Sequence, residues 1–295
     1  MCSIEKEQPV LIGAHVGVSA GYPESVDYAE GVGCEAIQVF AKSPQQWRAK
    51  SITPEIATAF RERRERSAVK FACTHTAYLI NLGSEDDALW EKSWQALADE
   101  LTRAVLLGVE ATVTHTGTNR SRDLELGARR IADGINLAFE AAPEGVLLLE
   151  NTAGAGTTYG TGPEELGAVL GMLDARWKER LGICLDSCHA HAAGWDFSTP
   201  AGWSEFTRGL ESCCGSGRIQ VVHANDCKFG VGERKDRHEW VGDGTIGTPG
   251  FAAMFAETRL AGAAAIVEMS GEVPEKDETN VSRLKALRAT SEARG

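Results

Sequence analysis

Short apolar runs alternate with longer amphipathic segments along the whole chain, and this alternation predicts strands and helices in turn. The short runs are rich in β-branched and other apolar residues, which is typical of strands buried on both faces. We expect strands at residues 10–15, 36–40, 70–75, 111–115, 146–151, 181–186, 219–226 and 264–269. Helix signals fill the gaps. Thr53 and Pro54 form a cap and first-turn pair, and Gly108 ends the longest helical segment.

Eight strand–helix units predict an α/β fold, a single-domain (β/α)8 TIM barrel over residues 1–295. A chain of 295 residues also has the length of two domains, but no linker or composition shift divides it. The alternative is an open doubly wound sheet, which needs a glycine fingerprint after its first strand. Gly13, Gly17 and Gly21 have the wrong spacing for it, so we favour the barrel.

Long glycine-rich segments follow several expected strands, notably at residues 151–162 and 229–247. In a barrel these segments are loops on the C-terminal face, where such folds build their active sites. The arginine-rich segment 61–66 differs, because it lies within a predicted helix and alternates with glutamates. That pattern indicates a solvated face of the outer helix ring.

The charge balance limits the choice of partners. Forty-two acidic and 30 basic residues give a net charge of −12, which excludes a generally basic nucleic-acid coat. Any affinity for DNA must then come from local patches or bound metal. No run approaches the roughly 18 apolar residues of a membrane span. Residues 1–10 have no apolar signal core, so we expect a cytoplasmic protein whose eight cysteines are thiols.

Metal-ligand residue types occupy the ends of six successive expected strands. They are His75, His115, Glu150, Asp186, His223 and Glu268. In a barrel they converge on one mouth. Histidine and carboxylate donors in this number suit divalent zinc, manganese or iron much better than they suit a nucleophilic triad.

Three further donors follow in the loops, namely His189 and the pair Asp236 and His238. In an extended Asp-x-His segment both side chains point to the same side. Nine donors exceed the needs of one ion and suffice for two or three, provided that a carboxylate bridges. The sequence therefore predicts a multinuclear site, and the chemistry typical of closely spaced metal ions is phosphoester hydrolysis.

The other histidines and two cysteines near the strand ends are not assigned to metal. We expect His15 to line the mouth and His191 to be structural. Cys73 and Cys184 share a strand face with two of the donors, and barrel packing is their expected role.

These residues lie within motifs that resemble endonuclease IV, the family of metal-dependent apurinic/apyrimidinic (AP) endonucleases of base excision repair. The motifs span nearly the whole chain in order. They are GAHV (13–16), THTAYLINL (74–82), THTG (114–117), LENTAG (149–154), CLDSCHAHAAGWD (184–196), VVHANDCKFGVGERKDRHEWVGDGTIG (221–247) and IVEM (266–269). The resemblance implies a TIM barrel that binds three zinc ions, with manganese or iron as possible substitutes.

The resemblance also implies how the ligands divide. One ion would be held by His75, His115 and Glu150; a second by Glu150 as a bridge with Asp186, His223 and Glu268; and a third by His189, Asp236 and His238. Glu150, Asp186 and Glu268 would act in catalysis through the metals, so no protein nucleophile is required. The implied enzyme is a zinc-dependent deoxyribonuclease IV, a phosphoric diester hydrolase.

The implied substrate is duplex DNA that contains abasic sites. Cleavage 5′ to the lesion would leave a 3′-hydroxyl and a 5′-deoxyribose phosphate, and the family also trims blocked 3′ ends. By resemblance, Gln45, Tyr78 and Leu79 belong to loops that wedge into the duplex, and Gln45 stands where the family often carries arginine. A basic loop beside the metal ligands could hold phosphates through Lys228, Arg234, Lys235 and Arg237. A monomer is expected.

Two other functions fit parts of this pattern. A metal-dependent TIM-barrel sugar isomerase or epimerase also places carboxylates and histidines at strand ends, but it needs fewer ions and leaves His189, Asp236 and His238 without a role. A non-catalytic abasic-DNA binding protein could retain the fold, although an intact ligand set argues against it.

Overall fold

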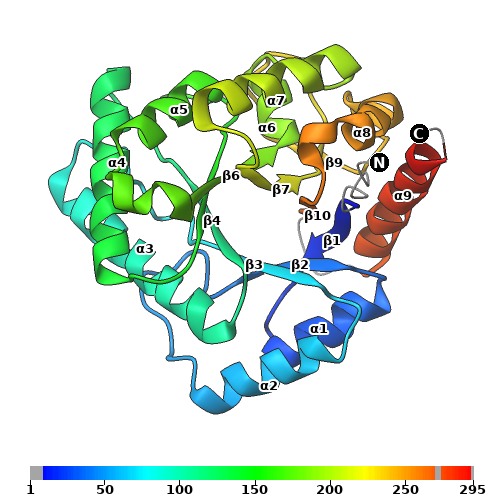
Figure 1. Cartoon of the computed structure of the whole chain (residues 1–295), viewed down its shortest axis with the longest axis horizontal. Helices are drawn as coiled ribbons and strands as arrows, with labels where there is room; N and C mark the ends of the chain where they lie inside the picture. Colours follow the sequence, from blue (N-terminus) through cyan, green and yellow to red (C-terminus); the bar gives the residue numbers. More distant parts are fainter. Residues whose placement is uncertain (1–8, 270–273, 294–295) are drawn as a thin grey trace, which may run out of the picture.

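A closed barrel of eight parallel strands forms the centre of the computed structural model, which describes residues 9–269 and 274–293 (Figure 1). The predicted TIM barrel is thus confirmed, and the open sheet is wrong. The predicted domain extends beyond the described residues at 1–8, 270–273 and 294–295. Around the barrel, neighbouring strands follow the order β1, β10, β7, β6, β5, β4, β3 and β2. The strands are β1 (Leu11–His15), β2 (Ala36–Phe40), β3 (Phe71–His75), β4 (Ala111–His115), β5 (Leu147–Glu150), β6 (Leu181–Asp186), β7 (Ile219–His223) and β10 (Ala264–Val267).

Helices form a ring around the barrel (Figure 1). They are α1 (Tyr22–Gly31), α2 (Pro54–Glu65), α3 (Asp87–Leu107), α4 (Leu124–Ala141), α5 (Pro163–Met172), α6 (Ser187–Ala193), α7 (Pro200–Cys214), α8 (Gly247–Ala256) and α9 (Pro274–Glu292), with short 3₁₀ turns at Ala175–Arg180 and Thr258–Leu260. The predicted end signals hold. The Thr53 side chain accepts a hydrogen bond from the Ile56 amide at the start of α2, and Gly108 closes α3 with φ 70°.

The arginine-rich segment 61–66 lies on the outer ring, as predicted. Arg63 forms ion pairs with Asp27 and Glu30 of α1, and Arg64 pairs with Glu110 beyond α3. These arginines therefore connect neighbouring helices and loops at the solvent-facing surface.

The interior of the barrel below its mouth is filled by small and branched side chains from alternate strand positions. They are Ala36, Cys73, Ala111, Val113, Leu148, Cys184, Val221, Ala264 and Ile266. Cys73 and Cys184 are fully buried among them, as a packing role requires. The Cys184 thiol also lies within 4.8 Å of donor atoms of Glu150 and His223. No helix within the described residues is long and apolar enough to cross a membrane.

The expected strand 219–226 is shorter than predicted, since β7 ends at His223. The chain then leaves the barrel and forms β8 (Asp226–Cys227), which pairs antiparallel with β9 (His238–Glu239). The hairpin between them returns residues 236–238 to the mouth. Periodicity alone did not reveal this two-stranded sheet, because each of its strands has only two residues.

The carboxylate of Asp226 anchors the segment that contains this hairpin. It is fully buried and accepts backbone N–H bonds at 2.8–3.3 Å from Cys227, Gly242, Gly244, Ile246 and Gly247. A Cβ atom on Gly244 would lie 2.4 Å from the Asp226 carboxylate, so this close approach requires glycine. One buried carboxylate thus fixes where the loop over the mouth begins and ends.

Candidate metal centre

The strand-end donors meet at the mouth of the barrel. The register pairs His115 with Glu150 and Asp186 with His223 across neighbouring strands. Their side chains converge, since Glu150 lies 3.2 Å from Nε2 of His75 and 3.1 Å from Nδ1 of His223. The barrel geometry therefore brings together residues that are far apart in sequence.

Glu150 belongs to two groups of donors at once. Its carboxylate, with the ring nitrogens of His75 and His115, forms a set whose atoms all lie within 4.8 Å of one another. A second set of the same compactness joins Glu150 to Asp186, His223 and Glu268. A carboxylate shared in this way can bridge two cations, one through each oxygen.

The three loop donors lie beside these two sets. His189 comes from α6, and its Nε2 is 3.3 Å from Asp236, which is also 3.3 Å from Nε2 of His238. His189 and His238 form a further compact group with Asp186. Asp186 therefore lies between the second and third donor sets.

Three of the histidines are held in one tautomer by backbone carbonyls. Nδ1 of His75, His189 and His238 donates to the carbonyl oxygens of Thr76, Asn151 and Glu268, respectively, at 2.8–2.9 Å. The opposite nitrogen, Nε2, then faces the carboxylates. This is the arrangement that typically orients a metal-binding histidine. Burial lowers the pKa of each ring, but the neighbouring carboxylates outweigh it and raise the pKa values of His75, His189 and His238, so a bound cation would replace a proton at Nε2.

His223 is oriented in the reverse sense by Gln38. Nε2 of His223 donates to the Gln38 amide oxygen at 2.9 Å, which leaves Nδ1 toward Glu150 and Glu268. The amide nitrogen of Gln38 donates to Glu268 at 2.7 Å. A fully buried side chain on β2 thus orients two donors that come from the ends of the neighbouring strands β7 and β10.

Two asparagines fix the remaining carboxylates. Asn225 donates to Asp186 at 2.7 Å and to Glu268 at 3.2 Å, and Asn151 exchanges hydrogen bonds with the Asp186 backbone. The sequence reasoning missed Gln38 as well as these two residues. The available signal was a polar amide within or directly after an apolar strand, next to a donor.

Burial and neighbouring charges shift the pKa values of this cluster in opposite directions. Burial lowers the pKa of His115 to about 4, so its ring is neutral at neutral pH. Burial raises the pKa of Asp186. Burial also opposes ionisation of Glu150, but His115 and His223 outweigh it and hold its pKa well below the usual carboxyl range.

This cluster fits divalent cations. Nε2 of His238 is buried and makes no well-aligned hydrogen bond among the described residues, although the Asp236 carboxylate lies 3.3 Å away. Neutral imidazole nitrogens and ionised carboxylates are the donors that zinc, manganese and iron accept. In the absence of cations, the packed carboxylates must share the protons of their histidine neighbours.

His15 and His191 lie at the edge of this cluster. Nδ1 of His15 is 2.9 Å from the Gln38 amide nitrogen and 3.4 Å from Glu268, so this ring lines the mouth. His191 is buried, and its Nε2 lies 3.1 Å from the Thr245 hydroxyl in the loop over the mouth.

A cavity of about 270 Å³ opens beside the cluster. His115, His189 and Asp236 lie on one side of it, and Tyr78 and Thr158 also line it. Tyr78 is 60% exposed although it follows a buried strand, and its ring packs edge-on against His75. An exposed tyrosine at the edge of a polar cavity can contact a bound ligand.

The loops that contain Gln45 and Tyr78 are held together from below. The Tyr78 amide donates to the Pro44 carbonyl, and the buried Glu100 of α3 accepts from the Ala77 amide at 3.1 Å. Glu100 also pairs with the buried amine of Lys42 at 3.4 Å. Gln45 is exposed and Leu79 is half-buried.

The basic loop presents cations with different surroundings. Lys228, Arg234, Lys235 and Arg237 are all exposed. Lys235 pairs with Glu233 at 3.0 Å and lies over the Phe229 ring. Arg234 and Arg237 have no carboxylate partner within the described part of the chain.

Comparison with known proteins places this chain in a family. Residues 26–289 match the family of xylose isomerase-like TIM barrels. "Probable endonuclease 4" of Methanoculleus marisnigri is 38% identical over 280 residues, covering 94% of this chain and 99% of that protein. The chain belongs to the endonuclease IV family. The corresponding protein of Chloroflexus aurantiacus is 39% identical over 278 residues, covering 93% of this chain and 97% of that one.

Solved structures agree with the family assignment. Endonuclease IV from Thermus thermophilus superposes with a TM-score of 0.84 at 36% identity, covering 95% of this chain and 99% of that one. A D-tagatose 3-epimerase-like protein gives a TM-score of 0.75 at 18% identity, covering 97% and 99% of the two chains. That likeness shows a shared fold alone, whereas the endonuclease IV likeness extends to the sequence.

Proposed function

We propose that this member of the endonuclease IV family hydrolyses the phosphodiester 5′ to abasic sites in duplex DNA. One observation carries the proposal: nine donor residues gather in one mouth, and Glu150 lies where it can bridge two of the sets. A sugar isomerase needs fewer ions and has no use for His189, Asp236 and His238. The names of the similar endonucleases support the same choice.

We assign three zinc ions to the cluster, with manganese or iron as substitutes. The first would be held by His75, His115 and Glu150; the second by Glu150, Asp186, His223 and Glu268; the third by His189, Asp236 and His238. When bound, such ions supply an activated water and stabilise charge on the phosphate oxygens. The protein contributes by fixing its donors before the ions arrive. Glu150, Asp186 and Glu268 would act in catalysis through the metal ions that they hold. No side-chain nucleophile is required.

The cavity beside the cluster would receive the damaged nucleotide. A nucleotide without a base leaves the stack at low cost, because no pairing is broken. Tyr78, Leu79 and Gln45 occupy loops that could fill the gap left in the duplex. Basic side chains at 228–237 would contact phosphates. Cleavage would leave a 3′-hydroxyl and a 5′-deoxyribose phosphate, and the same site would trim blocked 3′ ends.

The decisive experiment uses a duplex with one tetrahydrofuran abasic analogue. The metal-loaded protein should nick it on the 5′ side and leave the matched undamaged duplex intact. We expect the protein to be a monomer and to act in the cytoplasm. Metal analysis should give about three ions per chain. An uncut abasic duplex, or one ion per chain with aldose–ketose activity, would overturn the proposal. Binding to abasic DNA that persists in chelator without nicking would indicate a non-catalytic binding protein.

A further inference from the structure

Two arginines adopt a left-handed backbone conformation. Arg122, between β4 and α4, has φ 60°, and Arg234, between β8 and β9, has φ 56°. Among the described residues they are the only non-glycines with positive φ, and such residues are uncommon in proteins. Residues held in sparsely populated backbone regions cluster at functional sites. Both arginines line the same cavity, so the two residues with this uncommon backbone conformation belong to one site.

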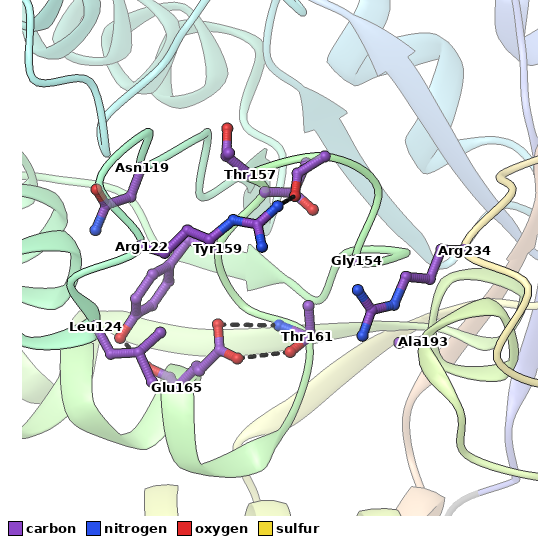
Figure 2. A pocket seen from close by; sticks show the side chains of 12 residues that line it. Asn119, Arg122, Leu124, Gly154, Thr157, Tyr159, Thr161, Glu165, Ala193 and Arg234 are labelled. Atoms are coloured by element: carbon purple, nitrogen blue, oxygen red, sulfur yellow. Dashed lines mark hydrogen bonds between the residues drawn. The ribbon is translucent and has the colours of Figure 1, made fainter.

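This cavity has a volume of about 180 Å³ and lies where three loops of the mouth meet (Figure 2). Figure 2 shows the side chain of Arg122 on one side and that of Arg234 on the other, with the loop at Gly154 between them. Thr158 lines both this cavity and the one beside the metal cluster. The two cavities are therefore neighbours on the same face.

The cationic groups in this cavity are not neutralised by the protein. Neither arginine has a carboxylate partner within the described ranges, and Arg122 donates only to the Gly156 carbonyl, at 3.3 Å. The one acidic residue of the lining, Glu165, accepts hydrogen bonds from the Gly160 amide at 2.7 Å and the Thr161 hydroxyl at 2.6 Å. Its charge thus stabilises the loop, and the two guanidinium groups keep donors for a ligand.

Backbone hydrogen bonds hold both arginines in place. The Arg234 amide donates to the Ala192 carbonyl at the end of α6 at 2.9 Å, and the Arg122 amide donates to the Asn119 carbonyl at 3.2 Å. Fixed positions reduce the entropy lost when a ligand binds. A planar guanidinium with parallel N–H donors matches the oxygens of a phosphate.

We infer that Arg122 and Arg234 bind a backbone phosphate of the DNA at a position away from the bond that is cut. The identity of the ligand as DNA rests on the proposed function. The site lies beside the metal cluster and shares no donor with it, so it contributes affinity and orientation. Free inorganic phosphate has the same chemistry and is the other source that a test must separate.

The test uses Arg122→Asn and Arg234→Asn, since asparagine tolerates the left-handed conformation and removes the guanidinium. For an undamaged duplex, each variant should bind about tenfold more weakly at fixed salt. The slope of log affinity against log salt concentration should fall by about 0.9 for each phosphate that the variant no longer neutralises. Arg122→Lys retains the charge and should keep the slope. Arg129→Gln removes an exposed arginine of α4 that pairs with Glu125, and it should change neither quantity.

Each outcome decides the inference separately from the proposed function, because duplex binding requires no cleavage. If wild-type protein nicks abasic DNA but both asparagine variants keep its salt slope, the inference is wrong and the proposed function stands. A lower melting temperature with an unchanged slope would assign the two arginines a structural role only.

A neutral-backbone scan locates the contact. One neutral methylphosphonate linkage at a time is placed along the strand. At one position it should weaken binding by the wild-type protein and leave binding by the double variant, Arg122→Asn with Arg234→Asn, unchanged. Equal sensitivity of both proteins at every position would contradict the inference. If inorganic phosphate raises the melting temperature of wild type while the DNA results are unchanged between variants, the site binds the free anion instead.

Discussion

The helix ring and the barrel mouth use arginine in opposite ways. Most arginines of the ring and its flanking turns form ion pairs with neighbouring carboxylates, namely Arg63, Arg64, Arg66, Arg103, Arg129, Arg130, Arg176, Arg218, Arg259, Arg283 and Arg288. Within the described residues, Arg61, Arg180 and Arg208 are the exceptions, and Arg61 and Arg180 donate to backbone carbonyls instead. At the mouth, Arg48, Arg120, Arg122, Arg234 and Arg237 have no such partner in the ranges that the structure describes. Four acidic side chains there, Glu150, Asp186, Asp236 and Glu268, face the histidine cluster instead.

The unpaired arginines give a chain with a net charge of −12 individual cationic groups at the mouth. The net charge is the sum over the whole chain, including the ring, where opposite charges lie close together and cancel locally. Affinity for an anion depends on the local field, which is strongest where cations remain unpaired near bound metal. The distribution of charge is therefore more informative than its sum.

The largest expected effect comes from the shared carboxylate of the mouth. Glu150→Gln should reduce nicking of the tetrahydrofuran duplex by about 10³-fold or more, because an amide cannot bridge two cations through both oxygens. Metal content should fall in the same sample. Near-wild-type activity would exclude the bridge.

A smaller loss is expected when a residue that orients the donors is replaced. Gln38→Leu removes the hydrogen bonds to His223 and Glu268 and should weaken metal affinity by about 10- to 100-fold. Titration with a zinc-sensitive dye measures it. If metal content is unchanged while the melting temperature falls, Gln38 contributes packing and hydrogen bonds only.

Tyr78→Ala tests the exposed part of the mouth. The side chain is 60% exposed, so its removal should cost little stability. We expect binding to an abasic duplex to weaken by about tenfold, within the range for loss of a base-stacking aromatic, and binding to an undamaged duplex to change much less. Equal losses for both duplexes would show that Tyr78 does not recognise the lesion.

Glu100 lies at the boundary between ring and mouth. Burial raises its pKa above the ordinary value of 4.5, so the folded state binds this proton more tightly than the unfolded chain. The free energy of unfolding therefore falls as pH rises from 4.5 to the raised value. Glu100→Gln lacks this titration.

Urea unfolding across that window measures the consequence. The free energy of unfolding of wild type minus that of Glu100→Gln should decrease as pH rises. An increase would mean that Lys42 stabilises the ionised carboxylate by more than burial opposes it.

The smallest effect is expected on the ring. Arg63→Gln removes two ion pairs at the solvent-facing surface, and it should lower the free energy of unfolding only slightly because water screens such pairs. Nicking and DNA binding should stay at wild-type levels. A change in the salt slope would break the contrast between ring and mouth.

The sequence was most informative where histidines and carboxylates recur at strand ends. Periodicity predicts the eight strands, and local cap signals predict the helix ends at Thr53 and Gly108. The donors converge because the parallel strands of a barrel end at one face. The individual metal roles and DNA contacts stay predictions. Gln38 and Asn225 were missed, because an amide in a strand has no characteristic spacing and its partner is set by tertiary packing.

The β8–β9 hairpin was missed for a related reason. Its pairing depends on Asp226, which collects backbone amides from as far as Gly247, and such an anchor is invisible to a local pattern. Likewise, nothing in the sequence indicates that Arg122 and Arg234 share a backbone conformation. That similarity depends on the loops around them.

The Asp226 anchor makes the opening of this loop cooperative. Its amide partners depend on a single carboxylate, so they should exchange with deuterium as one unit when the segment opens. Asp236 and His238 would then leave the mouth together, while the strand-borne donors remain in place. Of the three ions that we propose, the one assigned to His189, Asp236 and His238 should therefore dissociate first when metal is depleted, because two of its ligands lie on this loop.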